Sequence, residues 1–243
     1  MPQKYKTLEV VSLQLSTTSK YQDNLTSLLS YLHTYEEKHI IIAPEVCLTG
    51  FDYAQMETSA KFSSKALKTL QKVINEQILI LTLILKEGES FINQAVVIHK
   101  HKIIHTQEKV KLFKLADEDL YFSAGKQQGI KPFEIEGISY AILICFELRF
   151  KELWKQIEGV DVIFIPARWG KLRKNHLEIL SSALAVMNQC YVVVSNTCDE
   201  DMASSSAIIS PSGVSTRDDS KHVIESTIEC SQIRKMRRYI RLD

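Results

Sequence analysis

Three reactive side chains stand where apolar segments of the sequence end. Cys145 ends the run AILIC, Glu45 ends IIIAPE, and Lys109 lies in HTQEKVKLF, which follows another apolar segment. A thiol, a carboxylate and an ammonium group are the nucleophile, the proton acceptor and the positive charge needed to attack a carbonyl group. In α/β proteins such groups gather where strands end and loops begin. The sequence therefore indicates nucleophilic catalysis at a cysteine.

Each of these residues, taken alone, also has a purely structural interpretation. Free cysteine is among the most buried residue types, so Cys145 could be a small core residue. Glu45 follows Pro44 and could be a solvated loop carboxylate, while Lys109 belongs to a lysine-rich stretch, residues 100–114. Only the combination of the three favours catalysis.

Apolar patterning predicts the elements that must position these residues. Strands rich in Ile and Val alternate with helices and hairpins, which favours an α/β fold with mixed sheets covered by helices. No repeat or linker divides the chain, so we expect a single domain over residues 1–243. We expect strands at 8–15, 39–45, 78–85, 91–99, 102–105, 138–144, 161–167, 191–196, 205–210 and 222–228, and helices around Leu25–Leu32 and at about 59–76, 151–158 and 175–188.

Composition and charge restrict the class of protein. The 243 residues carry 30 basic and 29 acidic side chains, so no charge patch of the kind that binds nucleic acid or an anionic membrane is indicated. The most apolar segment, residues 78–85, is far shorter than the roughly 20 residues that cross a bilayer. Five cysteines without metal-site spacing, and an N-terminus without an apolar signal core, favour a reducing compartment. We expect a cytoplasmic protein whose partner is a small molecule.

The surroundings of the reactive residues form six segments, namely APEVCLTGF, KVKLF, CFELRFKE, IPARW, HLEILSSALAVMNQCYVV and SAIISPSG. In this order they resemble the motifs of the nitrilase superfamily of carbon–nitrogen hydrolases. Glu118 also stands seven residues before Gly125, as the family's second glutamate stands before its own glycine. The matches run from about residue 8 to about residue 213, and six in order at compatible spacing make a strong signal.

This resemblance implies a fold and a catalytic set. The fold would be an α-β-β-α sandwich. Cys145 would be the nucleophile, Glu45 the general base, and Lys109 the cation that faces the tetrahedral intermediate. Glu118 would be a fourth member that orients Lys109, and Phe146 would bind the substrate through its backbone N–H as a second oxyanion donor. The family works without metal or cofactor, so we expect neither.

The same resemblance suggests further substrate contacts. We expect Trp169 and His176 near the pocket, and Arg173 together with Arg168 could hold a substrate carboxylate bidentately. His176 also has an interpretation without function, as an exposed residue at a helix start that Asn175 caps. Surface solvation is likewise the commoner state of an arginine.

Proton transfer from Cys145 to Glu45 presents an energetic mismatch. Reference pKa values of about 8.5 for a thiol and about 4.3 for a glutamate make the transfer uphill by about 6 kcal/mol. The ammonium group of Lys109 would favour the thiolate, but it would also hold the carboxylate charged. We therefore expect the proton to be shared, with full transfer only as the substrate is attacked.

Six positions depart from the family pattern. Lys111 replaces a histidine and Lys151 a proline, without touching the catalytic set. The other four suggest changes elsewhere. Leu184 and Met187 replace an arginine and a glutamate three residues apart on one helix face, which suggests that an apolar contact has replaced an ion pair. Ser204 and Ser210 replace a glycine and an aspartate. These changes affect the expected specificity and subunit contacts more than the catalytic set.

The resemblance leads to the hypothesis of an amidohydrolase that cleaves a small linear amide to acid and ammonia through a cysteine thioester. The short chain and the segment LFKLADEDLYFSAG are most similar to the omega-amidase branch, which acts on monoamides of dicarboxylic acids such as 2-oxoglutaramate. An N-carbamoyl amino acid such as N-carbamoyl-β-alanine is the alternative substrate. The family also implies a homo-oligomer.

A hypothesis of another class is an inactive relative that serves as a binding or scaffold subunit. The four departures other than Lys111 and Lys151 suggest it. Retention of the whole catalytic set, Glu45, Lys109, Glu118 and Cys145, argues against it.

Overall fold

Two six-stranded sheets form the centre of the molecule. The computed structural model describes residues 7–241. The first sheet consists, in spatial order, of β12 (Val223–Glu229), β1 (Thr7–Leu13), β2 (Ile40–Ile42), β3 (Ile78–Glu87), β4 (Ser90–His99) and β5 (Lys102–Glu108). The second consists of β11 (Ser215–Arg217), β10 (Ala207–Ile209), β9 (Tyr191–Asn196), β8 (Val162–Ala167), β7 (Ile138–Ile142) and β6 (Phe133–Ile135).

Both sheets are mixed, as expected. In the first sheet β1, β2 and β3 are parallel, and in the second β7, β8 and β9 are parallel. The remaining neighbours pair antiparallel, chiefly through hairpins such as β3–β4 and β4–β5. Glu45 follows the parallel strand β2 of the first sheet, and Cys145 follows the parallel strand β7 of the second.

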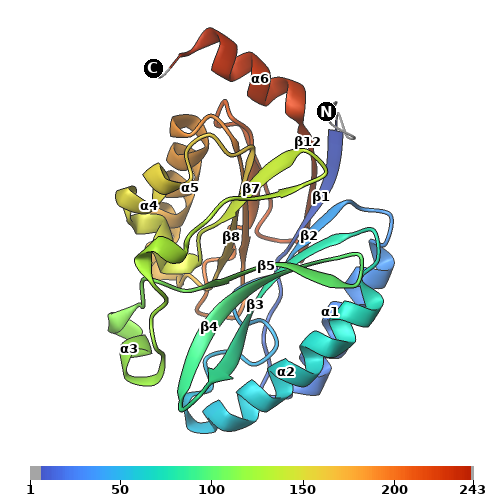
Figure 1. Cartoon of the computed structure of the whole chain (residues 1–243), viewed down its shortest axis with the longest axis vertical. Helices are drawn as coiled ribbons and strands as arrows, with labels where there is room; N and C mark the ends of the chain where they lie inside the picture. Colours follow the sequence, from blue (N-terminus) through green and yellow to red (C-terminus); the bar gives the residue numbers. More distant parts are fainter. Residues whose placement is uncertain (1–6, 242–243) are drawn as a thin grey trace.

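Helices cover the outer face of each sheet (Figure 1). Two helices, α1 (Tyr21–Thr34) and α2 (Met56–Val73), pack on the first sheet, and two others, α4 (Lys151–Gln156) and α5 (Lys174–Met187), pack on the second. The layers therefore follow the order α-β-β-α, which confirms the predicted fold class. Among the described residues, no helix is both long and apolar enough to span a bilayer.

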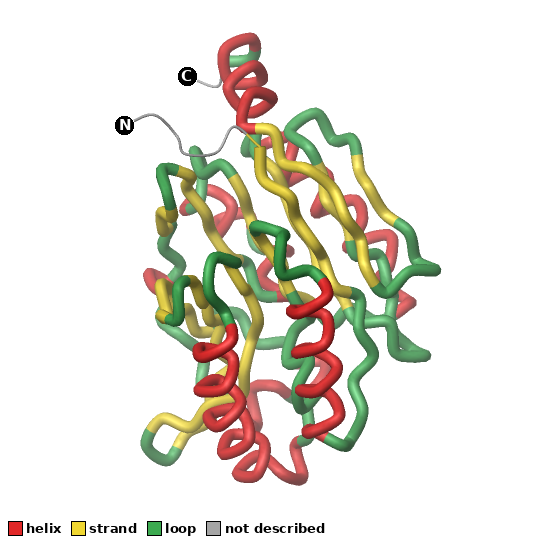
Figure 2. Tube along the Cα trace, turned by 90° about the vertical axis from the view of Figure 1, so that its right-hand side faces the viewer, coloured by secondary structure: helices red, strands yellow, loops and turns green. Residues whose placement is uncertain are grey.

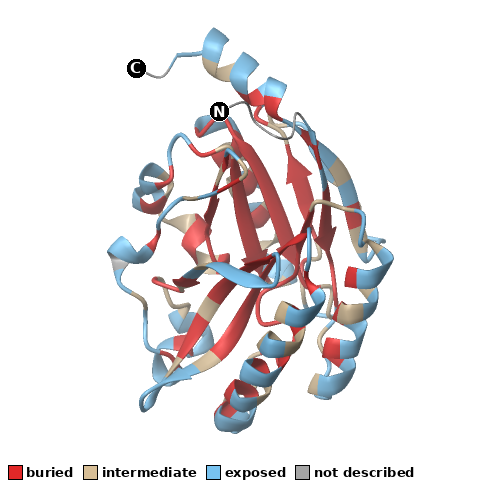
Figure 3. Ribbon diagram, turned by 45° about the vertical axis from the view of Figure 1, so that its right-hand side comes forward, coloured by how far each residue is buried: buried red, intermediate tan, exposed pale blue. Residues whose placement is uncertain are grey.

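The covering helices show why their sequences form helices at these places. In α1, Leu25, Leu28 and Leu32 are buried at the spacing of one helix face. In α2 the buried face is built largely from small residues, which let the helix lie close to β3. Figure 3 shows the result, with buried strands between helices whose outer faces are exposed.

Apolar side chains fill the space between the sheets. Val10, Ile40 and Ile80 of the first sheet share one core cluster with Tyr140 and Phe164 of the second. Both sheets contribute Ile and Val at most inward positions, which is the composition expected of strands buried on both faces.

Three buried hydroxyl groups also join the sheets. Ser12 of β1 donates to the carbonyl oxygen of Val194 in β9 at 2.6 Å, and Ser195 of β9 donates to the carbonyl oxygen of Leu13 at 2.6 Å. Thr197 makes the corresponding bond to Leu15 at 2.7 Å. These bonds pin β9 to β1 at the end where both strands approach the reactive residues.

The two strands that lead to Glu45 and Cys145 end earlier than the sequence predicts. We expected strands to residues 45 and 144, whereas β2 ends at Ile42 and β7 ends at Ile142. The chain thus leaves each sheet before Glu45 and Cys145, and both residues lie on loops rather than in strands.

Two α-helices and two strands were not predicted at all. One is the four-residue helix α3 (Glu118–Tyr121), which carries Glu118 and is too short to show a helical pattern. β6 and β11 are three-residue edge strands, too short to show an alternating pattern. The helix α6 (Cys230–Tyr239) follows β12 and projects beyond the layers in both views (Figures 1 and 2). Its buried residues are Cys230 and Ile233, and its many basic side chains gave no helical pattern of apolar residues.

Replacing Ser195 by Ala tests the connection between the sheets. The change removes a buried donor and leaves a buried carbonyl with one partner fewer, which should lower the free energy of unfolding by about 1 to 3 kcal/mol. Chemical denaturation of the purified protein measures this loss. The exposed Ser215→Ala serves as the matched control and should stay within about 0.5 kcal/mol of wild type. Equal stabilities of the two variants would contradict the proposed pinning.

Candidate active site

The three reactive residues reach one place from both sheets. Glu45 lies three residues after β2, Lys109 follows β5 directly, and Cys145 lies three residues after β7. The backbone N–H of Glu45 donates to the carbonyl oxygen of Ala167, the last residue of β8, at 3.2 Å. Loops from the two sheets therefore meet at this point.

The ammonium group of Lys109 joins two carboxylates. Its Nζ lies 2.7 Å from Oε1 of Glu45 and 2.8 Å from Oε1 of Glu118. The side chains of Lys109 and Glu45 are 0 % exposed and that of Glu118 is 4 % exposed. The second oxygen of Glu118 accepts the backbone N–H of Phe113 at 3.0 Å. Glu118 is thus held on two sides and fixes the ammonium group beside Glu45.

A residue that the sequence analysis missed, Asn93 of β4, supports the same pair. Its Nδ2 donates to Oε1 of Glu45 at 2.9 Å, and its backbone oxygen accepts the N–H of Lys109 at 2.8 Å. Asn93 Nδ2 and Lys109 Nζ both donate to Oε1 of Glu45. Oε2 of Glu45 has no hydrogen-bond partner among the described residues. That oxygen is the atom able to take a proton. A buried asparagine inside the apolar strand FINQAVVIH was the available sequence signal.

Gly125 allows the chain around Lys109 to close tightly. Its N–H donates to the carbonyl oxygen of Lys109 at 2.9 Å. A Cβ atom at this position would lie 2.7 Å from Cβ of Glu108, which is closer than atoms can approach. The spacing between Glu118 and Gly125 therefore reflects a physical requirement of this loop.

The electrostatics keep Lys109 charged. Burial alone would lower its pKa, but the charges of Glu45, Cys145 and Glu118 outweigh burial and raise the pKa above its ordinary value. Burial raises the pKa of Glu118, Lys109 opposes this increase, and the charge of Glu45 adds to it. One ammonium group between two carboxylates leaves the cluster short of positive charge.

Left-handed backbone directs the chain at two positions of the site. Cys145 has φ of 51° and Val46, next to Glu45, has φ of 44°. A β-branched residue such as valine rarely adopts this conformation, and strain of this kind clusters at functional sites. The N–H of Val46 donates to the hydroxyl group of Thr82 at 2.7 Å, which holds the strained turn in place.

The surroundings of Cys145 disfavour its thiolate. Burial raises its pKa well above the ordinary value, and the nearby charge of Glu45 raises it further. Lys109 lowers the pKa, as does a hydrogen bond from the backbone N–H of Arg168. Lys109 thus favours the thiolate, as expected, but burial dominates.

A narrow cleft opens at the Cys145 thiol. Glu45, Lys109 and Glu118 are not among its lining residues. Three of the four expected substrate contacts, Phe146, Trp169 and Arg173, line the cleft, whereas His176 does not. The indole Nε1 of Trp169 is buried without a hydrogen-bond partner among the described residues. The remaining lining residues are Phe113, Cys145, Arg149 and Arg168.

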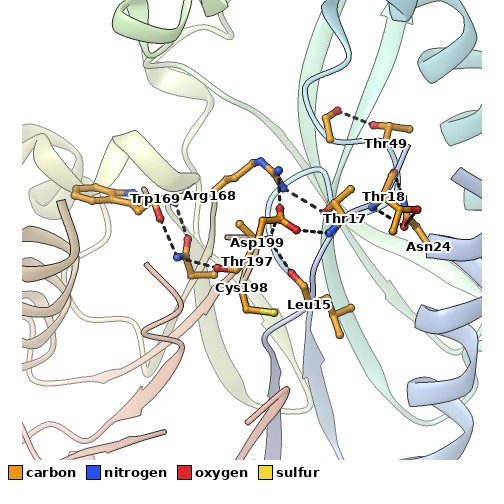
Figure 4. A network of polar contacts seen from close by, with 12 residues as sticks. Leu15, Thr17, Thr18, Asn24, Thr49, Arg168, Trp169, Thr197, Cys198 and Asp199 are labelled. Atoms are coloured by element: carbon orange, nitrogen blue, oxygen red, sulfur yellow. Dashed lines mark hydrogen bonds and ion pairs between the residues drawn. The ribbon is translucent and has the colours of Figure 1, made fainter. Parts of the chain in front are cut away.

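Arg168, whose role the sequence left open, is paired with an acidic residue. Its guanidinium group forms an ion pair with Asp199 at 2.6 Å and donates to the hydroxyl group of Thr17 at 3.2 Å (Figure 4). Asp199 also accepts the N–H of Thr17 and the hydroxyl group of Thr197. Figure 4 shows this network linking the loops after β1, β8 and β9. Arg168 therefore anchors the loop whose N–H reaches the thiol.

Two other arginines in the cleft have no acidic partner. Arg149 stacks on Trp169 at 4.8 Å and Arg173 stacks on Phe113 at 5.0 Å. No carboxylate among the described residues forms an ion pair with either. Burial and then the charge of Arg173 lower the pKa of Arg149. Sequence analysis missed Arg149, although it stands four residues after Cys145 in CFELRF.

Two interpretations of α5 need correction. The helix begins at Lys174 with Arg173 at the N-cap position and no side-chain cap, so Asn175 does not cap it. His176 is exposed and lies with Nδ1 2.8 Å from Nη2 of Arg149, which gives it an indirect place beside the cleft.

The structure shows the surroundings of three positions that depart from the family pattern. Leu184 is fully buried and Met187 is 62 % exposed, so the pair is not a buried apolar contact. Ser204 has φ of 54°, the left-handed conformation that glycine adopts without strain. The backbone at this position thus has the conformation that the expected glycine would adopt without strain, whereas serine adopts it with some strain.

Chemically, the site combines a thiol, a buried carboxylate with one oxygen unpaired among the described residues, and an ammonium group, beside a cleft lined by arginines. These are the parts of a cysteine-based acyl transfer site. Among the described residues, no group of three or more His, Cys, Asp or Glu side chains is arranged to hold a metal ion.

Comparison with known proteins agrees with this geometry. The family model for carbon-nitrogen hydrolases matches residues 10–238. The chain is 32 % identical over 191 residues to a 2-oxoglutaramate amidase of Bacillus subtilis, which covers 73 % of each chain. It is 25 % identical over 182 residues to the Omega-amidase YafV of Yersinia enterocolitica, covering 74 % of this chain and 70 % of the relative. The solved structure of an amidase from Nesterenkonia sp. superposes with a TM-score of 0.85, at 18 % identity and 96 % coverage of each chain.

Two variants should shift the pKa of the Cys145 thiol in opposite directions. Glu45→Gln removes a nearby negative charge and should lower that pKa, whereas Lys109→Met removes a positive charge and should raise it. The pH dependence of iodoacetamide alkylation, followed on the Cys145 peptide by mass spectrometry, gives the midpoint for each variant. Thermal melting verifies that both variants fold. Shifts of the same sign would show that these charges do not control the thiol.

Proposed function

Because the chain belongs to the carbon-nitrogen hydrolase family, it is a hydrolase of carbon–nitrogen bonds, and we propose that it cleaves small linear amides that carry a carboxylate. The products would be a dicarboxylic acid and ammonia, as for an omega-amidase. The single observation that carries this proposal is the pair Arg149 and Arg173, which lines the cleft at Cys145 without an acidic partner among the described residues.

Two like charges in a small cleft require an anion. Arg149 and Arg173 repel each other. Burial lowers the pKa of Arg149, and the charge of Arg173 lowers it further. A substrate carboxylate would relieve this repulsion, and guanidinium groups bind carboxylates through paired hydrogen bonds. The stacking of each guanidinium group on an aromatic ring holds it ready for such a ligand. The indole N–H of Trp169 would supply a further donor.

The relatives support the same class of substrate. One is a 2-oxoglutaramate amidase and another is an omega-amidase. 2-Oxoglutaramate combines a terminal amide with a carboxylate, which are the two groups that this cleft would accommodate.

The first half-reaction would form a thioester. Oε2 of Glu45 takes the proton of the Cys145 thiol while the sulfur attacks the amide carbon. The oxyanion that develops is stabilised by the ammonium group of Lys109 and the backbone N–H of Phe146. When the tetrahedral intermediate collapses, the carbon–nitrogen bond breaks and the nitrogen leaves as ammonia with the proton from Glu45. The acyl group remains on Cys145.

The second half-reaction would release the acid. Glu45 takes a proton from water, whose oxygen attacks the thioester carbon. Collapse of the second tetrahedral intermediate expels the sulfur, which recovers its proton from Glu45. Glu118 takes no proton in this scheme, because its role is to hold Lys109 against both oxyanions. The high pKa of the resting thiol makes transfer concerted with attack the easier route.

An N-carbamoyl amino acid is the second candidate substrate. It also carries a carboxylate for Arg149 and Arg173, and its hydrolysis would add carbon dioxide to the products. An inactive scaffold is the candidate of another class. The protein retains the complete cluster of Glu45, Lys109 and Glu118. A scaffold protein would not need this cluster.

A comparison of charged and neutral amides tests the proposal. Ammonia release should show kcat/KM for glutaramate at least about 100-fold above that for valeramide, which lacks the carboxylate. Arg173→Gln should lower kcat/KM for glutaramate about 10- to 100-fold, because it removes a hydrogen bond to a charged group worth about 1.5 to 3 kcal/mol. The same variant should change valeramide turnover by less than about 3-fold.

Three controls belong to this assay. Lys171→Gln removes an exposed charge from the same turn and should leave both substrates unaffected. Cys145→Ala should release no ammonia. N-carbamoyl-β-alanine tests the second candidate substrate. A higher kcat/KM for this compound than for glutaramate would favour the carbamoyl reaction. Wild type that favours valeramide would overturn the carboxylate proposal, and wild type inactive on every compound would favour the scaffold.

We also propose that the protein assembles as a homo-oligomer through the outer face of α5. That face presents Ile179, Val186 and Met187 to solvent at positions i, i+7 and i+8 of the helix, at 65, 47 and 62 % exposure. Val214, on a turn beside Val186, is 70 % exposed. A run of exposed apolar side chains of this kind is typical of a protein–protein contact.

Sedimentation velocity measures the assembly. Wild type at micromolar concentration should sediment as a dimer or larger species, and Ile179→Glu combined with Met187→Glu should sediment as a monomer, because the charges prevent burial of this face. Thr58→Glu on the exposed side of α2 is the control and should leave the assembly intact. A monomeric wild type would contradict the proposal.

All five cysteines are unpaired in the structure. This supports our placement of the protein in a reducing compartment, the cytoplasm.

A further inference from the structure

Glu147 is a buried carboxylate that the proposed reaction does not use. It lies in the turn Cys145–Arg149, is 0 % exposed and does not line the cleft. Both of its oxygens accept backbone N–H groups. Oε1 bonds to the N–H of Val110 at 2.6 Å, and Oε2 bonds to the N–H of Ile144 at 2.7 Å.

The two N–H groups belong to the neighbours of the two reactive residues. Val110 follows Lys109 at the end of β5 in the first sheet, and Ile144 precedes Cys145 beyond β7 in the second. A single rigid carboxylate therefore sets the distance between the chain segments that carry the ammonium group and the sulfur. Bonds to charged acceptors are short and directional, so this link is stiffer than one between neutral groups.

The other bonds around Lys109 do not make this connection. Asn93 and Gly125 hold the backbone of Lys109 to parts of the chain other than the turn at Cys145. A second link between the same two strands exists farther from the site, where Nε2 of Gln107 donates to the carbonyl oxygen of Ile142 at 3.1 Å. Gln107 thus offers a matched control, because it joins β5 to β7 without touching the neighbours of Lys109 and Cys145.

We propose that Glu147 is a positioning residue whose ionised carboxylate holds the Lys109 ammonium group in register with the Cys145 sulfur, so that the oxyanion forms within reach of Lys109. This inference rests on the proposed amidase function. It assigns a reason for an acidic residue two positions after the nucleophile, since only from there can one side chain reach back to Ile144 and across to Val110.

The charge of Glu147 changes within the physiological range. Burial raises its pKa to about 7, against the opposing effects of the N–H groups of Ile144 and Val110, the charge of Lys109 and the N–H of Lys111. Below that pH the carboxyl group is protonated and can no longer accept equally at both oxygens. Activity should therefore fall as pH decreases through about 7.

Stability should respond in the opposite direction. Because the pKa of Glu147 is higher in the folded than in the unfolded protein, its contribution to stability is lost as pH rises from about 4.5 to about 7. Protonation thus favours the fold while it weakens the alignment. A residue with a merely structural role would show the stability effect without the activity effect.

Kinetics of Glu147→Gln test the inference. The amide would place N–H groups against a backbone N–H, so kcat for glutaramate should fall about 10- to 100-fold with KM within about 3-fold of wild type. The wild-type kcat should show an ionisation near pH 7, and the variant should lack it. Gln107→Leu should keep kcat within about 3-fold of wild type. Equal effects of Glu147→Gln and Gln107→Leu on kcat, or a wild-type profile flat from pH 5.5 to 8, would overturn the inference.

An NMR titration separates this inference from the proposed function. In wild type the amide protons of Val110 and Ile144 should titrate together with a midpoint near pH 7, and Glu147→Gln should abolish the titration. This measurement needs no substrate. The wild-type titration can be read even if the Glu147→Gln variant does not fold. Wild type that hydrolyses no amide but shows the titration would refute the function and retain the link. Active wild type whose two amide protons do not titrate would refute the link alone.

Discussion

The structure depends on one buried ammonium group shared by two carboxylates. Lys109 lies within hydrogen-bond distance of both Glu45 and Glu118, with all three side chains withdrawn from water. Removing one partner of such a cluster leaves an uncompensated buried charge, which typically costs about 3 to 5 kcal/mol. The cluster can exist only because backbone and amide donors satisfy the remaining oxygens, except Oε2 of Glu45. That exception is the atom that the proposed chemistry uses.

The two sheets solve the problem of bringing these charges to one sulfur. The first sheet supplies Glu45 and Lys109 from strand ends, and the second supplies Cys145. Neither sheet holds a complete site, so the packing between them decides the geometry. Buried hydroxyl groups and the carboxylate of Glu147 cross from one sheet to the other near this point. Left-handed backbone at Val46 and Cys145 then turns the chain out of each sheet.

The surroundings of the sulfur contain charges of both signs. A buried cluster with excess negative charge influences the thiol, and the cleft that Cys145 lines contains arginines. Asp199 pairs with Arg168 and makes it part of the scaffold, while Arg149 and Arg173 form no ion pair among the described residues. Under the proposed function, reaction and recognition would therefore depend on different residues. A change in the cleft arginines would alter which amide binds, without disturbing the ammonium group and the two carboxylates.

The sequence alone determined the α/β class, most strands and the candidates Glu45, Lys109, Glu118 and Cys145. Apolar runs and local motifs depend only on residues close together in the chain, so they can be recognised without a structure. It also led to Phe146, Trp169 and Arg173, which the cleft brings together with Cys145. Tertiary structure alone decided that Asn93 and Glu147 support the site, that Asp199 occupies Arg168, and that Arg149 faces the cleft. These roles arise from partners far apart in the chain, which meet only when one sheet packs on the other.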